Sequence, residues 1–527
     1  MSLIYLVEAT AWDIAASAEV TLRWCSGDGY VTGPGETPAN TVFAPRLLEP
    51  INYERHAWSS GTTSGESRVG AGLIELANPD GELDGLVGDY ALDGRALRVL
   101  IGQDSAPYAD FQPLLTGTME QPEVTSTRAR IRIRDRARLL DEPIQTATYA
   151  GTSTGSTGLE GGDDVRGRPK PLTYGVARNV SAVLVNASLL AFQVHDGPVQ
   201  DVTAVYVRGA AITKGADYTS QSQLESSAPS TGTYRVWPGG GMFRLGSQPD
   251  GQVTADVGGD AAGGNYVSAV PAIVERIITT RGGLTADDIG VSVGSLASSL
   301  TQPVGAHISG GGPIRQTLDD LCASLGLYWY FDQQGAFQLG RLEAPAGAPA
   351  LTLQTFGGRG IVAEPDSADV LSLERQSSRD EGNGLPAWRV TVGYRRNWTV
   401  QSPGDLAGAV SEARKSTVSR DMLTTAPADD TSVQAVHLLA TELRRDTLLD
   451  AAADAEVERD RLAGIYGVRR DRYRVRVQLS GDVAAVDLGS VVRLQVPRFG
   501  LDGGKLMTVT GVVYDARRSI LELDLWG

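Results

Sequence analysis

Hydrophobic and polar residues alternate in three short runs along the C-terminal segment, residues 486–527. The first run ends at Pro497, because proline cannot donate a hydrogen bond to a neighbouring strand. The second covers residues 506–514, after a connection rich in glycine, and the third covers 520–525, after a short turn. Glycine and aspartate tolerate the backbone conformations of tight turns. The pattern therefore predicts an antiparallel meander whose last strand closes a sheet.

The same alternation is found in the N-terminal part of the chain. Residues 37–50, which contain several prolines, are expected to form an ordered loop. The segment Asn78-Pro79-Asp80-Gly81 is a strong turn signal between two strands. The N-terminal part is thus predicted to be all-β, and further strands are expected as far as about residue 257. The strands predicted here cover residues 2–11, 20–24, 69–76, 94–102 and 114–117.

Helical spacing of apolar residues is found only later in the chain. Pro271 opens an apolar stripe that predicts a helix over 271–278. A second helix is predicted over 314–324, followed by a hairpin over 327–339, which makes a small α+β module. Apolar steps of three and four residues, with mixed charge between them, predict a helical segment at about 432–467. The predicted fold class is mainly β with an α+β insertion and a helical segment in the C-terminal half.

Three stretches divide the chain: a Gly/Ser/Thr-rich one at 149–164, a glycine-rich one at 258–265 and a Pro/Ala/Gly-rich one at 344–350. A length of 527 residues exceeds one ordinary domain. We therefore expect three or four domains, which these stretches separate. The expected domains are 1–150 (all-β), 151–265 (β-rich insertion), 266–344 (small α+β domain) and 345–527 (β with the helical insert).

Composition and charge exclude several classes of function. The net charge of −16 argues against binding nucleic acid by bulk electrostatics, although an acidic surface would let DNA pass without sticking. Two cysteines are too few for a disulfide framework or a cysteine-ligated cluster. No basic region precedes the apolar residues at the N-terminus, and no apolar run reaches membrane-spanning length. We expect a soluble protein that is made in a reducing cytoplasm.

Arginine occupies every second position over residues 128–138, with apolar residues between the first of them. On a strand, this period places the arginines on one face and the apolar residues on the other. Like charges along one face repel unless carboxylates oppose them. Two interpretations remain open: a basic row that faces another subunit or a lumen, or a row paired within its own sheet. The residues are Arg128, Arg130, Arg132, Arg134, Arg136 and Arg138.

Signals for catalysis are weak. Ser153 and Ser292 each lie in a Gly-x-Ser-x-Gly segment, but a nucleophile elbow needs a buried strand before the serine and a helix after it. The four histidines show no zinc-binding spacing, and His195-Asp196-Gly197 is more typical of a turn than of a triad. The aspartates near residues 80–93 miss the EF-hand spacing. We expect no catalytic residue, no cofactor and no metal.

Blocks of this sequence resemble the baseplate hub (tail tip hub) proteins of tailed bacteriophages, in the same order along the chain. The blocks are 37–145, 167–212, 271–343 and 486–527. They include "SRVGAGLIELANPDGELDGL", "GRPKPLTYGVARNV" and "DLGSVVRLQVPRFGLDGGKLMTVTGV". No block is a catalytic motif, and the resemblance rests on the order and joint presence of all of them.

The resemblance implies a structural, non-enzymatic virion protein. Hub proteins of this kind form ring-shaped homotrimers at the tail tip, and each subunit contributes two related β-barrels, here about 1–150 and 345–527. Three subunits then present a pseudo-sixfold face to a sixfold distal tail or tube protein. The other implied partners are the tape measure protein, tail fibre or tip proteins, and phage DNA in transit through the lumen. The implied location is the tail tip or baseplate of the virion, after synthesis in the cytoplasm of the host bacterium.

Other functions are compatible with the same composition. A carbohydrate-binding tail adhesin would also be rich in strands and turns, and it would show sugar affinity and no ring. A serine hydrolase that uses Ser153 or Ser292 is a more remote alternative, and alanine at the catalytic serine would then abolish its activity.

Overall fold

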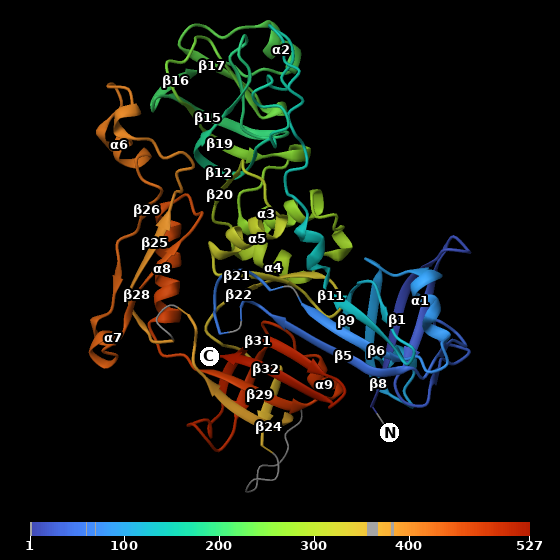
Figure 1. The fold of residues 1–527 in the computed structure, drawn as a ribbon. Helices are drawn as coiled ribbons and strands as arrows, with labels where there is room; N and C mark the ends of the chain where they lie inside the picture. The colour runs from blue at the N-terminus through green and yellow to red at the C-terminus, as the bar shows by residue number, and fades with distance from the viewer. Residues whose placement is uncertain (1–2, 60, 69, 356–366, 381–383) are drawn as a thin grey trace.

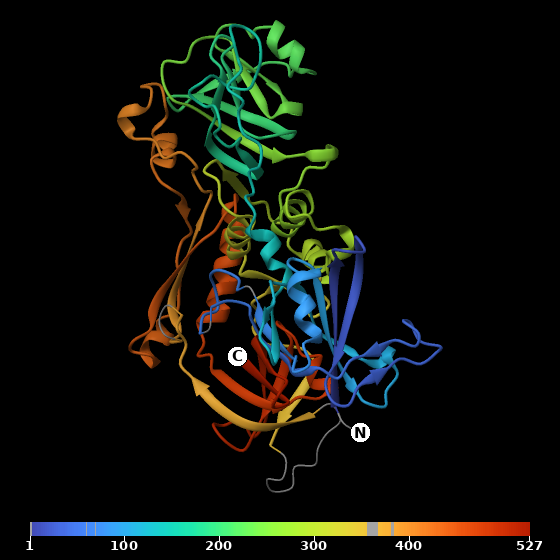
Figure 2. The same ribbon diagram turned by 45° about the vertical axis from the view of Figure 1, so that its right-hand side comes forward.

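The computed structural model describes residues 3–59, 61–68, 70–355, 367–380 and 384–527. The molecule is elongated (Figure 1). Two barrel-like parts lie at one end, a helical module lies next to them, and a separate β domain lies at the other end. An arm of strands and helices runs along one side. Figure 2 shows the same order of parts after a turn about the long axis.

The C-terminal half contains a closed barrel. Among the described residues it has six strands in the order β31-β30-β23-β24-β29-β32, and β32 pairs with β31 to close it. The predicted C-terminal meander is confirmed, since β31 pairs antiparallel with both β30 and β32. Val492 and Leu494 are fully buried inside, as the period of two along a strand requires. The strands are β23 (Leu351–Gln354), β24 (Ser367–Gln376), β29 (Arg472–Gln478), β30 (Val491–Gln495), β31 (Lys505–Asp515) and β32 (Ile520–Trp526), with the short helix α9 (Gly481–Ala484) before β30.

The N-terminal strands form a half-barrel that continues the sheet of the closed barrel. β5 pairs antiparallel with β31, from Asn52 opposite Asp515 to His56 opposite Gly511. From β5 the order runs β5-β6-β11-β9-β8-β1-β2. Buried residues of both parts belong to one hydrophobic core. The elements are β1 (Leu3–Asp13), β2 (Ala18–Cys25), β3 (Tyr30–Val31), β4 (Val42–Phe43), β5 (Leu47–His56), β6 (Ala71–Ala77), α1 (Gly85–Gly88), β7 (Tyr90–Ala91), β8 (Ala96–Gln103), β9 (Gln112–Met119), β10 (Glu123–Val124) and β11 (Arg128–Arg134).

The expected loop over 37–50 is shorter in the structure. β5 already begins at Leu47, and β4 also lies within this range. The pairing of β5 with β6 shifts register on both sides of Glu49. Such irregularities let Pro50 occupy a strand without donating to the ladder.

The β domain at the far end contains, in the described part of the chain, a sheet ordered β13-β14-β18-β17-β16-β15-β19-β12-β20. The glycine-rich break predicted over 258–265 begins only after Asp260, because Gly258 and Gly259 belong to β19. A Cβ on Gly259 would lie 2.3 Å from the carbonyl oxygen of Thr173, so glycine permits this close strand approach. The elements are β12 (Leu172–Ser181), β13 (Val183–Asn186), β14 (Ala191–Gln193), β15 (Val199–Val207), β16 (Ala210–Lys214), α2 (Gln221–Ser226), β17 (Thr233–Trp237), β18 (Met242–Leu245), β19 (Val253–Asp260) and β20 (Gly305–Ile308).

The predicted helices and hairpin of the α+β module are present as α3 (Val270–Thr280), α5 (Ile314–Ala323), β21 (Leu327–Phe331) and β22 (Phe337–Arg341). The structure adds a helix that the sequence did not predict, α4 (Val291–Ser299). Only Val293 of this helix is buried. Its sequence, VSVGSLASS, contains four serines and a glycine, which disfavour a helix interior, and this explains why the pattern missed it.

The arm departs from the helical segment predicted over 432–467. Its middle, Thr441–Asp446, is strand β28, which pairs in parallel with β25 and buries Leu443. Strand pairing here outweighs the local preference of a mixed-charge sequence for helix. The arm consists of β25 (Ala387–Tyr394), α6 (Glu412–Val418), β26 (Leu423–Thr424), β27 (Ala428–Asp429), α7 (Thr431–Val436), β28 (Thr441–Asp446) and α8 (Ala452–Tyr466).

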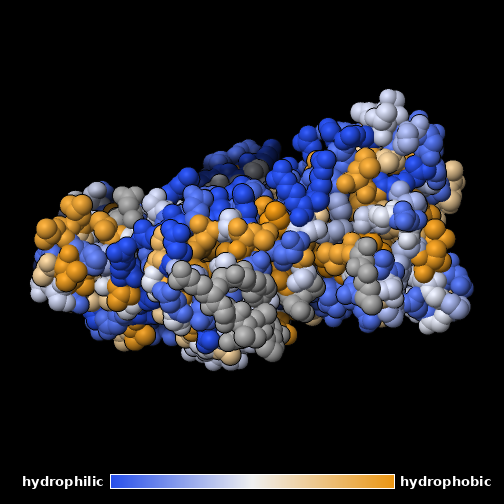
Figure 3. Space-filling model, turned by 90° about the horizontal axis from the view of Figure 1, so that it is seen from below, coloured by the Kyte–Doolittle hydropathy of each residue, from blue (hydrophilic) through white to orange (hydrophobic). Residues whose placement is uncertain are grey.

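Polar and apolar side chains are interspersed over the end of the molecule that carries the barrels (Figure 3). Apolar surface gathers at the left end of that view, on the side of the arm in Figure 1. Val436, Leu438 and Leu439 at the tip of the arm are all strongly exposed. None of the helices that the structure describes is long and apolar enough to cross a membrane.

Candidate functional site

The arginine row lies on β11, between β6 and β9. Residues of β11 alternate strictly between exposed arginines and buried alanine or isoleucine, as the sequence predicts. The strand ends at Arg134, earlier than the sequence suggests. Asp135 then caps a 3-10 turn over Arg136–Asp141, in which its carboxylate accepts a hydrogen bond from the N–H of Ala137. Arg136 and Arg138 therefore lie in the turn, and the strand face itself carries Arg128, Arg130, Arg132 and Arg134.

Each arginine of the row lies near a carboxylate of its own chain. Glu75, on the neighbouring strand β6, pairs with Arg128 and lies 3.5 Å from Arg130. Glu123 lies 2.8 Å from Arg132, and Glu120 pairs with Arg134 and lies 3.5 Å from Arg138. Asp288 lies 2.6 Å from Arg136.

Six guanidinium groups thus share four carboxylates, which leaves the row positively charged. The hydrogen bond from Arg136 holds the pKa of Asp288 at about 2, so that carboxylate stays ionised at neutral pH. The remaining arginines of the row are about half exposed, from 45% for Arg134 to 63% for Arg138. The row can therefore accept further carboxylates from outside this chain.

A buried polar network, which the sequence did not reveal, joins the half-barrel, the closed barrel and the α+β module. Arg55 of β5 is 2% exposed, and its guanidinium donates to the carbonyl oxygen of Phe331 at 2.8 Å and to Asp487 at 2.6 Å. Burial raises the pKa of Asp487, whereas Arg55 lowers it. Nearby, Gln333 donates to the hydroxyl of Tyr514 at 2.7 Å. The network fixes the seam at which β5 meets β31.

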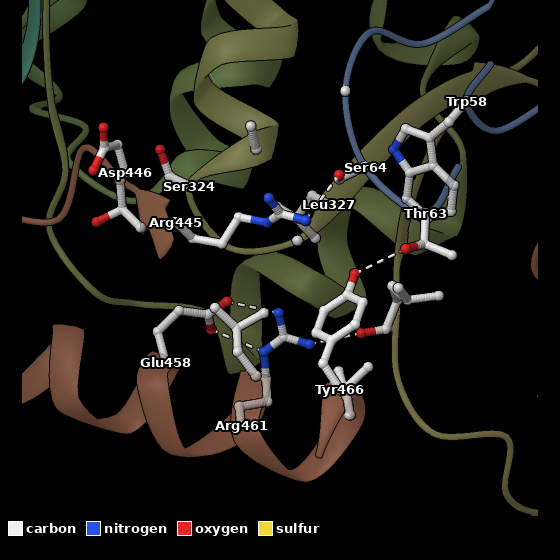
Figure 4. Close-up of a pocket in the computed structure, with 17 residues that line it drawn as sticks. Trp58, Thr63, Ser64, Ser324, Leu327, Arg445, Asp446, Glu458, Arg461 and Tyr466 are labelled. Atoms are coloured by element: carbon white, nitrogen blue, oxygen red, sulfur yellow. Dashed lines mark hydrogen bonds and ion pairs between the residues drawn. The ribbon is translucent and has the colours of Figure 1, made fainter. Parts of the chain in front are cut away.

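A cavity of about 220 Å³ lies between α8, the end of α5 and the segment that follows β5 (Figure 4). Glu458 and Arg461 lie one turn apart on α8 and form an ion pair of 2.6 Å. The hydroxyls of Tyr466 and Thr63 are 2.9 Å apart. These polar groups are satisfied by one another, so the cavity resembles a packed junction between parts more than a reaction centre.

The serines singled out as hydrolase candidates have other partners. The hydroxyl of Ser153 accepts from the N–H of Glu160 at 2.9 Å. The hydroxyl of Ser292, in the first turn of α4, donates to Gln338 at 2.6 Å and accepts from the N–H of Leu339 at 2.9 Å. None of these hydrogen bonds joins either serine to a histidine.

The other candidate residues are also engaged in structure. His195 is buried, and its Nδ1 accepts from the N–H of Thr173 at 2.9 Å. Asp80 accepts from Arg46, whose hydrogen bond lowers the pKa of Asp80 to about 2. Within the described ranges, no group of three or more histidine, cysteine, aspartate or glutamate residues could hold a metal ion.

Solved structures similar to this chain include tail proteins, two of them from prophages. The tail protein of Neisseria meningitidis MC58 is 10% identical, with 99% of this chain and 96% of that chain covered, at a TM-score of 0.42. The 43 kDa tail protein of prophage MuSo2 from Shewanella oneidensis is 11% identical, with 99% and 98% covered, at a TM-score of 0.41.

A chain of the native gene transfer agent virion is 16% identical, with 74% of this chain and 91% of that chain covered, at a TM-score of 0.40. No family model matches the sequence, and no curated protein matches it. Because these TM-scores lie below 0.5, the likeness by itself assigns no function to this chain.

Proposed function

We propose that this chain is a structural, non-enzymatic baseplate hub of a bacteriophage tail tip. The observation that carries the proposal is the pairing of β5 with β31, which joins a half-barrel and a closed barrel side by side in one sheet. The hub family that the sequence resembles uses two related barrels in each subunit. The strands of the half-barrel lie within residues 3–134, and those of the closed barrel lie within residues 351–526.

In the proposed assembly, a homotrimer closes into a ring. Three copies of two barrel-like parts present six similar units, which suits a distal tail or tube protein with sixfold symmetry. A ring needs heterologous contacts, in which one surface meets a different surface of the next subunit. The ring would close the end of the tail tube, contact the tape measure protein and the fibre or tip proteins, and let DNA pass on infection. Its place would be the tail tip of the virion, after synthesis in the host cytoplasm.

The arginine row is the proposed intersubunit or lumen-facing surface. Its six arginines share only four carboxylates of their own chain, although the chain as a whole carries a net charge of −16. Surplus arginine that meets surplus carboxylate on the next subunit would set the register of the ring. In a lumen, the same row would lie close to the DNA backbone.

The mass of the purified full chain, measured by light scattering and followed by negative-stain imaging, tests the proposal. We expect a particle of three times the 55.6 kDa subunit mass, with a central hole. A carbohydrate-binding adhesin would instead remain without a ring and bind a sugar. A monomer at every concentration, together with saturable sugar binding, would contradict the hub function and support the adhesin.

A further inference from the structure

A polar cavity of about 430 Å³ lies between the far β domain and the arm, away from the barrels. β12 contributes Arg178 and Asn179 to its wall, and the segment after β25 contributes Arg395 and Asn397. Helix α6 closes it with Arg414. In Figures 1 and 2, α6 lies beside the β domain at the end of the arm.

Positive charge exceeds negative charge around this cavity. Arg178 forms a two-point contact with Asp450, at 2.9 and 2.8 Å, and its third nitrogen lies 3.5 Å from Asp256. Arg395 lies 3.7 Å from the same Asp450. Arg414 forms no ion pair within the described part of the chain. Three guanidinium groups therefore meet two carboxylates in a protein that is acidic overall.

Several N–H groups of these arginines remain available. The Nε of Arg395 donates to the carbonyl oxygen of Asp450 at 3.1 Å, and its two terminal nitrogens have no acceptor among the residues that the structure describes. Arg414 donates through Nε to Gly209 at 3.1 Å and through Nη2 to Asn179 at 3.4 Å. Its remaining nitrogen, Nη1, has no acceptor in the same described ranges. Guanidinium groups with free N–H pairs match the geometry of carboxylate and phosphate.

Two residues that line the cavity have strained backbone conformations. Asn179 and Arg395 both adopt positive φ, 53° and 51°, a conformation that is uncommon for residues other than glycine. Asn179 sits at a register shift of β12 against β19, and its amide donates to Asn397 at 2.9 Å. Asn397 in turn donates to the carbonyl oxygen of Val418 on α6 at 2.7 Å. Strained residues held by a buried hydrogen-bond network are typical of binding sites.

The guanidinium group of Arg414 is also fixed in orientation. The guanidinium of Arg414 lies over the ring of Tyr206, with its Cζ 3.4 Å from the ring centroid. The hydroxyl of Tyr206 donates to Asp256 at 3.1 Å. Stacking leaves the edge of the guanidinium open, so Nη1, which has no acceptor among the described residues, can donate to a ligand.

We propose that this cavity binds an oxyanion, either a phosphate or a carboxylate group, through Arg395 and Arg414. Arg178 is already held by Asp450 and Asp256, so it contributes positive potential rather than direct contacts. The residues of the site belong to the far β domain and the arm, away from the arginine row on β11.

Calorimetric titration of the full chain tests the site, with inorganic phosphate in one experiment and succinate in the other, in a chloride buffer free of other oxyanions. We expect one binding event per chain. Arg414→Gln and Arg395→Gln should each weaken it by about tenfold or more, the usual effect of losing charged hydrogen bonds. Preference for phosphate would identify a phosphoryl group as the ligand, and preference for succinate a carboxylate; either result supports the proposal.

Arg166→Gln is the matched control, because Arg166 is an exposed arginine that pairs with Asp163 outside the cavity. Arg414→Lys keeps the charge but loses the planar fork, so it should bind more weakly than the unmodified protein while folding normally. Absence of saturable binding to both probes would overturn the proposal. Equal weakening by Arg166→Gln would also overturn it, because binding would then follow net charge alone.

Discussion

At the scale of single residues, the seam between the two barrel-like parts depends on buried charges. Arg55 and Asp487 come from different parts of the chain and neutralise each other at 2.6 Å. Asp135, 4% exposed, accepts from the N–H groups of Gly70 at 2.6 Å and of Ala137 at 2.9 Å. A buried charge pair adds little net stability, but removing one partner is costly because the other charge is left without compensation. Arg55 and Asp487 therefore link the two parts, whereas Asp135 fixes the backbone at Gly70 and Ala137.

Asp135 should make stability depend on pH. Burial raises its pKa from 3.8 to about 6, although the N–H groups of Gly70 and Ala137 lower it. The pKa of Asp135 is higher in the folded chain than in the unfolded chain. The stability that its protonated carboxyl contributes is therefore complete below pH 3.8 and is lost as pH rises to about 6. The loss is roughly 3 kcal/mol. The side chain of the Asp135→Asn variant cannot ionise. The difference in unfolding free energy between the unmodified protein and this variant should therefore change by this amount between pH 4 and 6 and stay constant above pH 6. Urea titrations measure this difference. Parallel pH profiles would contradict this prediction.

At the scale of elements, helix α8 is anchored by one buried carboxylate. Glu458, 3% exposed, lies 2.6 Å from Arg461 on the same helix and 2.9 Å from Arg341 on β22. It therefore fastens the arm to the α+β module. The sequence of α8 alone gives no hint of this, since Glu458 is one of several acidic residues in a mixed-charge stretch.

Glu458→Gln should destabilise the fold by about 3 kcal/mol, because it leaves the largely buried guanidinium groups of Arg341 and Arg461 with only the half-exposed Glu343 as a counter-charge. Glu456→Gln, at an exposed position of the same helix, removes the same charge and should change stability by less than about 1 kcal/mol. Thermal unfolding of both variants measures the difference. Equal melting temperatures for the two variants would show that the buried pair does not anchor α8.

At the scale of the whole molecule, the half-barrel and the closed barrel share one sheet and one core. Their relative placement is therefore rigid. The far β domain and the arm extend away from this unit (Figure 1) and carry the proposed oxyanion site. The arginine row proposed for subunit contact and the proposed oxyanion site thus lie on different parts of the molecule.

The double substitution Arg132→Ala with Arg138→Ala should weaken the proposed ring without unfolding the subunit. Both side chains are about 60% exposed, so loss of their ion pairs costs less than about 1 kcal/mol each. We expect a smaller fraction of three-subunit particles by light scattering, with an unchanged melting temperature. Arg517→Ala with Arg518→Ala, at an exposed turn, is the control. An unchanged mass distribution in the Arg132 and Arg138 variant would exclude the row from the contact.

The candidate sites differ in how much of them the sequence reveals. The arginines of β11 follow a local period of two, which the sequence displays directly. Their partner Glu75 lies on another strand, and its pairing depends on the register between β6 and β11. The cavity residues Arg178, Arg395 and Arg414 are far apart in the chain, and no local pattern links them. Only the bulge of β12 and the docking of α6 bring them together.

The sequence by itself determined most strands of the half-barrel, the C-terminal meander and most of the α+β module, because these follow from local alternation and turn residues. Tertiary structure decided what local patterns cannot encode. Residues 441–446 form strand β28 because they pair with β25, and the two barrel-like parts form one sheet because β5 pairs with β31. Pairing over long separations depends on burial and hydrogen bonds that exist only after the chain has folded.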